Sequence, residues 1–147
     1  MIELPGSFSG MINSPMPLRG PLQLLLTLTR LYNRSHYDKR LGSMIICAGL
    51  AHSAGLDDDD TDMLILSALV HDIGEMYIDP EYLNDERELW PDEWEHVASH
   101  PRTAYAFVSE FTRFPAAVAE SVLQHHERID GSGYPYRLSG DAISAVS

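Results

Sequence analysis

The chain has 147 residues, enough to bury one hydrophobic core, and 44% of them are hydrophobic, as in an ordinary globular domain. Its 22 acidic and 10 basic residues give a formal net charge of -12, which argues against binding duplex nucleic acid through general electrostatics. The single cysteine, Cys47, excludes an internal disulfide, and neither a membrane span nor a signal peptide is evident, so we expect a cytoplasmic protein.

The first third of the chain changes from an irregular to a helical composition. Residues 1–20 contain several glycines and prolines without a sustained period, which predicts a linker or a loosely packed arm. Residues 21–147 are expected to form one domain, because helical periodicity begins at Pro21 and the leucines that follow it. A second helix, ending near Gly55, is predicted by an apolar side made of Leu41, Met44, Ile45, Ala48 and Leu50.

Two later helices are predicted to end in pairs of metal-capable side chains. The acids at 57–60 suit a helix N-terminus, where carboxylates cap backbone N–H groups and complement the helix dipole. The spacing i, i+4, i+7, i+8 then links Leu64, Ala68, His71 and Asp72. After Pro115 the same spacing links Val118, Val122, His125 and His126. Because adjacent residues on a helix lie about 100° apart, both members of each pair can face one pocket.

The interval between these helices carries weaker signals. Residues 90–93 predict the start of a short helix that runs to His100, and Pro101 predicts the start of another that runs through Phe111. No strand-like alternation of useful length and no internal repeat occurs in the sequence. The sequence therefore predicts an all-α fold, a bundle of short helices without a significant sheet.

The His71-Asp72 pair, the isolated His100 and the stretch from His125 to Pro135 (HHERIDGSGYP) together resemble the HD-GYP family. This family is the cyclic-dinucleotide phosphodiesterase branch of the HD-domain metal-dependent phosphohydrolases, and the resemblance runs from about His36 to the C-terminus. It implies two divalent transition-metal ions bridged by Asp72, with Asp72 and His71 as catalytic residues. The implied metal-binding residues are His36, His71, Asp72, His100, His125 and His126.

The ligand types and the reaction agree with this resemblance. Mixed imidazole and carboxylate ligands suit transition metals better than Ca or Mg, so we expect Fe or Mn, followed by Zn or Ni. Two ions about 3.5–4 Å apart would supply hydroxide at neutral pH and neutralise charge on the phosphoryl oxygens. No serine or cysteine nucleophile is then required, and Cys47, which is expected to lie far from the motifs, is a poor candidate.

The loop after His126 is expected to shape the entrance of the site and to place the substrate. In this reading Tyr134 stacks on a base, Arg128 pairs with a phosphate or braces Asp130, and Glu127 and Asp130 orient the imidazoles. The predicted substrate-binding residues are Arg128, Gly131, Gly133, Tyr134 and Pro135. The alternative is a tight surface loop without a binding role, which glycines and prolines commonly form.

Three departures from the family pattern bear on activity. Glu75 stands where the family has a lysine associated with substrate phosphate, and a carboxylate would repel a phosphate. Tyr32 stands where some members have a glutamate for a third metal, so two metals are expected. The family pattern also continues with a helix that carries another metal-binding aspartate, and this helix is not in the sequence up to Ser147.

We therefore expect a metal-dependent phosphodiesterase that hydrolyses cyclic di-GMP or a related cyclic dinucleotide in bacterial second-messenger signalling. A degenerate module that binds nucleotide or a protein partner without turnover is the alternative, and Glu75 favours it. Another HD-type nucleotide phosphohydrolase is a further alternative, against which the DGSGYP loop argues. A regulatory domain, a regulatory protein partner and the formation of a homodimer are all compatible with the sequence.

Overall fold

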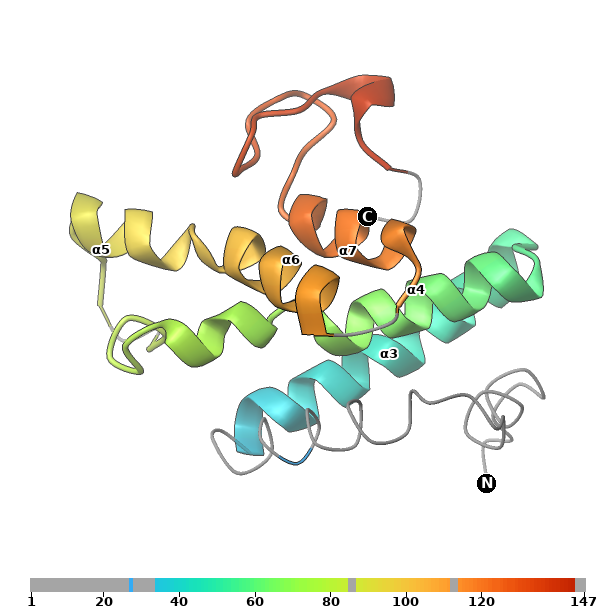
Figure 1. Ribbon diagram of the computed structural model, residues 1–147, viewed down its shortest axis with the longest axis horizontal. Coiled ribbons are helices and arrows are strands. Elements are labelled where there is room, and N and C mark those ends of the chain that lie inside the picture. Colours follow the sequence, from blue (N-terminus) through green and yellow to red (C-terminus); the bar gives the residue numbers. More distant parts are fainter. Residues whose placement is uncertain (1–26, 28–33, 85–86, 112–113, 145–147) are drawn as a thin grey trace.

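The computed structural model describes residues 27, 34–84, 87–111 and 114–144, and these form a bundle of helices (Figure 1). The α-helices are α3 (Arg34–Ala54), α4 (Asp58–Val70), α5 (Pro91–Val97), α6 (His100–Phe111) and α7 (Ala116–Gln124), with 3-10 turns η1 (Ile73–Tyr77) and η2 (Gly140–Ala142). Within this part of the chain the only β pairing is an isolated bridge between Asp130 and Ser139, so the all-α prediction is confirmed. The arm at 1–20 and the helix expected after Pro21 lie outside the described residues.

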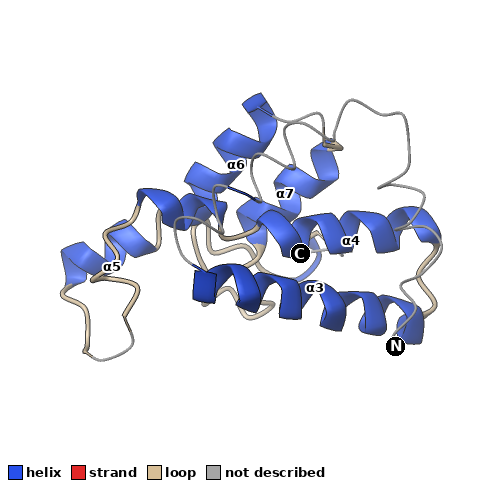
Figure 2. Ribbon diagram, turned by 90° about the horizontal axis from the view of Figure 1, so that it is seen from below, coloured by secondary structure: helices blue, strands red, loops and turns tan. Residues whose placement is uncertain are grey.

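Helices α3 and α4 form an antiparallel pair, which is visible in both views (Figure 1; Figure 2). Helix α3 ends at Gly55, whose φ of +70° lies in the left-handed region that glycine adopts without strain. Helix α4 begins after Asp57, whose side chain accepts a hydrogen bond from the backbone N–H of Asp60 at 2.9 Å. Both predicted helix boundaries are confirmed. None of the described helices is long and apolar enough to cross a membrane.

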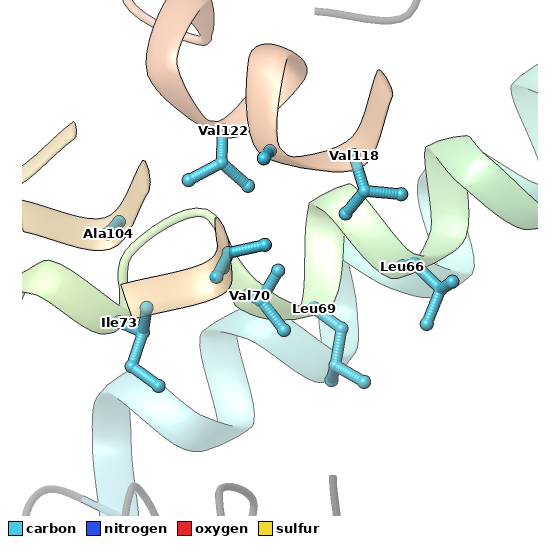
Figure 3. Close-up of a cluster of buried hydrophobic side chains, with 9 residues drawn as sticks. Leu66, Leu69, Val70, Ile73, Ala104, Val118 and Val122 are labelled. Carbon is cyan, nitrogen blue, oxygen red and sulfur yellow. The ribbon is translucent and has the colours of Figure 1, made fainter. Parts of the chain in front are cut away.

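The core lies where α6 and α7 pack on α4 and η1 (Figure 3). Burying each of its larger aliphatic side chains contributes about 1.5–3 kcal/mol, so the helix ends at this junction are held firmly. Val118 and Val122, from the predicted stripe of α7, are fully buried there. The buried cluster consists of Leu66, Leu69, Val70, Ile73, Ala104, Val108, Val118, Ala119 and Val122.

The apolar side of α3 differs in part from the prediction. Leu41 and Met44 pack against the core, but Ile45 and Leu50 are 51% and 61% exposed. At 100° per residue these two side chains lie roughly 100° or more around the helix from the buried Ala51. Only the side of α3 that faces α4 is buried. The apolar character of a side chain in this helix was therefore not sufficient to predict that the side chain is buried.

The approach of η1 to the start of α6 requires a glycine. A Cβ atom on Gly74 would overlap the backbone carbonyl of His100 and crowd the backbone nitrogen of Ala104. Because Gly74 has no side chain, the segment from Asp72 through Ile73 to Gly74 can lie against α6. This packing brings residues from two distant parts of the chain to one place.

Candidate metal centre

Three helix ends converge on the candidate metal centre. His71 is the C-cap of α4, His125 is the C-cap of α7, and α6 begins at His100. The sequence predicted that two helices end in metal-capable pairs on their inward side, and the observed ends of α4 and α7 confirm the predicted boundaries. The partial negative charge of a helix C-terminus favours a cation at two of these ends.

The ligand atoms of Asp72, His100, His125 and His126 all lie within 4.8 Å of one another. Asp72 Oδ1 is 3.6 Å from His100 Nε2 and 3.5 Å from His125 Nε2, and these two nitrogens are 3.2 Å apart. His71 Nε2 lies 2.8 Å from the other oxygen of Asp72. The structure thus brings together five of the six predicted metal-binding residues around one carboxylate.

Backbone carbonyl groups orient three of the imidazoles. The Nδ1 atoms of His71, His100 and His125 lie 2.9, 2.8 and 2.6 Å from carbonyl oxygens three residues earlier in the chain. A carbonyl oxygen can only accept, so Nδ1 donates in each case and the neutral ring presents a lone pair at Nε2. Metal-binding histidines generally show this arrangement, with the second ring nitrogen fixed by a hydrogen bond.

The facing ligand atoms fit a divalent transition-metal ion. The Nε2 lone pairs of His100 and His125 point toward each other beside the carboxylate of Asp72, an arrangement that is unfavourable unless a proton or a metal cation is shared. Ligands of one such ion stand roughly 3–3.5 Å apart, because each lies about 2 Å from it. The separations of 3.2–3.6 Å agree with that requirement.

The ionisation of the cluster also suits metal binding. Burial alone would raise the pKa of Asp72, but hydrogen bonds from His125 and His71 and their positive charge hold it well below its usual range. Burial lowers the pKa of His126 to about 3 and, with the nearby His125, also lowers the pKa of His100. Burial opposes protonation of His71 too, but its hydrogen bond to Asp72 raises the pKa overall. At neutral pH the cluster therefore offers an ionised Asp72 carboxylate and the neutral imidazoles of His100 and His126.

The sixth predicted metal-binding residue, His36, falls in the first turn of α3. Its side chain lies outside what the structure describes, so its role remains a prediction. Tyr32, on which the expectation of two rather than three metals rests, also lies outside the described residues. The two remaining histidines of the chain, His52 and His96, are exposed.

Arg40 is a residue of the site that the sequence did not reveal. It is buried, and its Nη2 donates hydrogen bonds to the backbone carbonyl of Asp72 at 2.8 Å and to Glu75 Oε2 at 3.0 Å. Glu75, which was expected to repel a phosphate, is thus paired with a cation within the protein. The one available signal was a basic residue on an otherwise apolar helix side, four positions after His36.

The loop that follows α7 folds back over the end of that helix. The Glu127 carboxylate accepts hydrogen bonds from the backbone N–H groups of Tyr136 and Leu138 at 2.7 and 2.9 Å. Asp130 accepts from the backbone and hydroxyl of Ser132 at 2.9 and 2.6 Å. These two acids therefore organise the loop, whereas backbone carbonyls orient the imidazoles, which differs from the expected role of Glu127 and Asp130.

The glycines allow the loop to turn tightly beside the cluster. Gly131 has a φ of +76°, and a Cβ atom on Gly133 would collide with the backbone of residues 126–128. The Tyr134 ring stacks on His126, with centroids 4.5 Å apart and an interplanar angle of 19°, and Pro135 follows it through a cis peptide bond. Arg128 is exposed, with Nε 3.8 Å from Asp130 Oδ1. The loop is therefore in contact with the predicted metal site through Tyr134.

A cavity of about 370 Å³ opens between α3, α4 and α7 beside the cluster. Cys47 lines it together with His71, His125 and His126, so the inference that this cysteine is remote from the motifs was wrong. The reason is that α3 runs antiparallel to α4 and returns Cys47 to the site. Burial raises the pKa of the Cys47 thiol, which disfavours the nucleophilic thiolate.

Comparisons with known proteins agree with this geometry. The chain is 35% identical over 133 residues to a cyclic di-GMP phosphodiesterase of Pseudomonas aeruginosa, an alignment that covers 88% of this chain and 32% of the relative. It is 39% identical over 98 residues to the cyclic di-GMP phosphodiesterase response regulator RpfG of Xanthomonas campestris, covering 65% and 26%. It is 34% identical over 100 residues to a 3′3′-cGAMP-specific phosphodiesterase of Vibrio cholerae, covering 67% and 19%.

The chain thus spans a third or less of the length of these curated relatives. The resemblance drawn from the HD pair and the GYP loop is nevertheless confirmed, because these relatives are named as phosphodiesterases of cyclic di-GMP or 3′3′-cGAMP. A sequence model described as the HD domain matches residues 23–147, which is most of the chain. The chain therefore belongs to the HD domain family.

Proposed function

We propose that the protein is a metal-dependent phosphodiesterase that hydrolyses a cyclic dinucleotide, cyclic di-GMP or a close relative, in bacterial second-messenger signalling. The observation that carries the proposal is the convergence of Asp72, His100, His125 and His126, whose ligand atoms lie within 4.8 Å of one another. The names of the relatives, which act on cyclic di-GMP or 3′3′-cGAMP, support the substrate class.

The residues of the chain would hold the metal and keep it reactive. The backbone hydrogen bonds at Nδ1 fix the lone pairs of His100 and His125 toward Asp72, so little reorganisation is needed when a cation binds. The lowered pKa of His126 keeps its ring neutral and available near pH 7. When bound, the metal supplies Lewis acidity toward water and the phosphoryl oxygens.

We propose that the protein binds two divalent ions, Fe or Mn before Zn or Ni, which Asp72 would help to hold. The mixed nitrogen and oxygen ligands support a transition metal over Ca or Mg. His36 would complete the ligand set from α3, and His71 would join it from the other side of the carboxylate. In this proposal Asp72 and His71 are the catalytic pair.

A module without turnover remains the second candidate, because Glu75 replaces the phosphate-associated lysine. Its ion pair with Arg40 weakens that objection, since the carboxylate charge is compensated within the protein. Arg128 is an exposed basic residue of the loop, and we propose that it meets a substrate phosphate while Gly131, Gly133, Tyr134 and Pro135 shape the entrance. Another HD-type nucleotide phosphohydrolase would have to use this same loop for a different substrate.

We also propose that residues 21–147 act as one domain whose output a regulatory domain or protein partner controls. Its dinucleotide substrate is a small messenger, so the proposed place of action is the cytoplasm. A homodimer is compatible with this proposal. Size-exclusion chromatography with light scattering tests for the dimer.

The deciding experiment measures metal content after anaerobic purification, together with turnover of cyclic di-GMP by the same sample in Mn or Fe. We expect about two metals per chain and hydrolysis, with both lost in His126→Ala. His96→Ala is the matched control, because this exposed histidine should leave metal and turnover unchanged. Metal without hydrolysis of any cyclic dinucleotide would favour the binding module. No metal at all would refute the enzymatic proposal for this chain.

A further inference from the structure

A series of aromatic rings leads from the metal cluster to the surface. The Tyr134 ring lies 4.5 Å from His126 and, on the way outward, 5.7 Å from the Trp94 ring of α5, at interplanar angles of 19° and 74°. Trp94 is 49% exposed, and α5 lies at the outer end of the molecule in both ribbon views (Figure 1; Figure 2). An indole surface therefore stands in solvent two ring contacts away from a predicted metal-binding residue.

Tyr134 itself has less free surface than its motif suggests. One face of its ring is stacked on His126, and the ring is also 6.4 Å from His100 at a steep angle. Its partial burial among these rings raises its pKa. Trp94, by contrast, meets Tyr134 at a steep angle and keeps about half of its surface exposed. The open aromatic surface beside the cluster thus belongs mainly to Trp94.

We propose that Trp94 is a stacking surface for one nucleobase of the cyclic dinucleotide, and that it contributes to substrate binding. This inference rests on the proposed function, which places a phosphate at the Asp72 cluster. A nucleobase is separated from its phosphate by one ribose, so a base beyond Tyr134 falls within reach of Trp94. Aromatic rings stack on any base, so this contact accepts guanine and adenine alike.

The negative net charge of the protein explains why a contact that does not depend on ligand charge would help to bind the substrate. With a formal net charge of -12, the chain does not attract a doubly anionic ligand by its overall field. Near the cluster Arg40 is already paired with Glu75, and the charge of Arg128, the residue proposed to meet a phosphate, is partly opposed by Asp130 at 3.8 Å. Stacking is independent of ligand charge, and therefore compensates for a weak electrostatic contribution.

Tryptophan fluorescence tests the proposal directly, because the chain contains two tryptophans, Trp90 and Trp94. In Trp90→Phe all indole emission comes from Trp94, and we expect cyclic di-GMP to quench it on stopped-flow mixing, before hydrolysis. In Trp94→Phe the emission comes from Trp90, and we expect no quenching. The proposal would be overturned if ligand quenched the emission of Trp94→Phe only. It would also be overturned if neither cyclic di-GMP nor 3′3′-cGAMP quenched the emission of Trp90→Phe.

A set of variants separates stacking from a structural effect. Trp94→Ala should weaken binding of cyclic di-GMP and of GMP by about 5- to 150-fold, and Trp94→Phe should retain most of the affinity. Trp90→Ala is the matched control, because it removes an indole that is 71% exposed at the start of the same helix. Ribose 5-phosphate, which has no base, should bind Trp94→Ala as it binds the wild type. Equal losses for ribose 5-phosphate and GMP would show a structural role and contradict stacking.

The same measurements distinguish this inference from the proposed function. Quenching of Trp94 without hydrolysis would support stacking while refuting the phosphodiesterase proposal. Hydrolysis with an unchanged KM in Trp94→Ala would support the enzyme and overturn stacking. If both hold, Trp94→Ala should raise KM with little change in kcat, because the stacking contact is made in the ground state and the transition state alike.

Discussion

The guanidinium of Arg40 in α3 forms an ion pair with the carboxylate of Glu75 in η1, with Nη2 and Oε2 3.0 Å apart. The two side chains are 6% and 16% exposed, so the pair is largely removed from water. The same nitrogen donates to the backbone carbonyl of Asp72. Arg40 therefore ties the first described helix to the segment that carries the predicted bridging carboxylate.

Removing this cation should destabilise the protein strongly. Arg40→Met removes the cation that pairs with Glu75 in a largely buried position, and breaking such a pair typically costs about 3–5 kcal/mol. Urea unfolding at neutral pH measures the change. Adding Glu75→Gln to Arg40→Met should recover part of the loss, because the carboxylate charge is then removed together with the cation. The neighbouring, exposed Lys39 gives the control Lys39→Met, and an equal loss there would show that the ion pair is unimportant.

Gly74 provides a second test of how the site is assembled. Gly74→Ala places a methyl group against the backbone of His100, so η1 and α6 must move apart, at a cost of at least ~2 kcal/mol. Metal affinity should fall as well, because His100 then shifts relative to Asp72. Thermal unfolding and metal titration of the same sample measure the two effects.

Gly49→Ala is the matched control for that substitution. Gly49 lies exposed in α3, with no atom within 4 Å of an added Cβ, so alanine should stabilise the helix by about 0.5–1 kcal/mol. If Gly74→Ala behaved like Gly49→Ala, the close approach of η1 to α6 would not be required for the site.

The sequence predicted those parts of the site that depend on local signals. The N-cap at Asp57, the helix end at Gly55 and the metal-capable pairs that close two helices all follow from residues within one or two turns. Periodicity then placed the pairs on the buried side of their helices, because the side of a helix that packs against the core is fixed by its apolar spacing.

The remaining features depend on contacts between distant segments. Arg40 meets Asp72 and Glu75 across 32 and 35 residues, and no local pattern specifies which basic residue of a helix becomes buried. Trp94 meets Tyr134 only because the loop after α7 returns toward α5. The packing of α3 on α4 likewise determines that Ile45 is exposed and that Cys47 lines the cavity.

The stability of the metal-free protein should fall as the pH falls from about 6.5 toward 3. Burial, followed by the charges of His125 and His100, lowers the pKa of His126 to about 3 in the folded state, from 6.5. Between these values the unfolded chain binds a proton that the folded chain does not bind, so acid favours unfolding. The urea midpoint of protein treated with chelator, at about pH 7 and about pH 4.5, measures this loss.

His126→Gln isolates the contribution of that histidine to the pH dependence. Glutamine cannot be protonated in this range, so the variant should lose less stability on acidification than the wild type. His71 acts in the opposite direction, because its raised pKa favours the protonated folded state. A decline as steep in His126→Gln as in the wild type would assign the acid sensitivity to other groups.

Metal binding should couple the ends of α4, α6 and α7 and thereby raise the melting temperature. A ligand that binds only the folded state adds about 2.7 kcal/mol at a concentration 100 times its Kd, so chelation should lower Tm by several degrees and Mn should restore it. Asp72→Asn weakens the shared carboxylate and should abolish most of the Mn-dependent rise. His52→Ala, an exposed histidine in the last turn of α3, should respond to Mn as the wild type does. If Mn raised the Tm of Asp72→Asn as much as that of the wild type, the cation would bind elsewhere and the four-residue cluster would not be the metal centre.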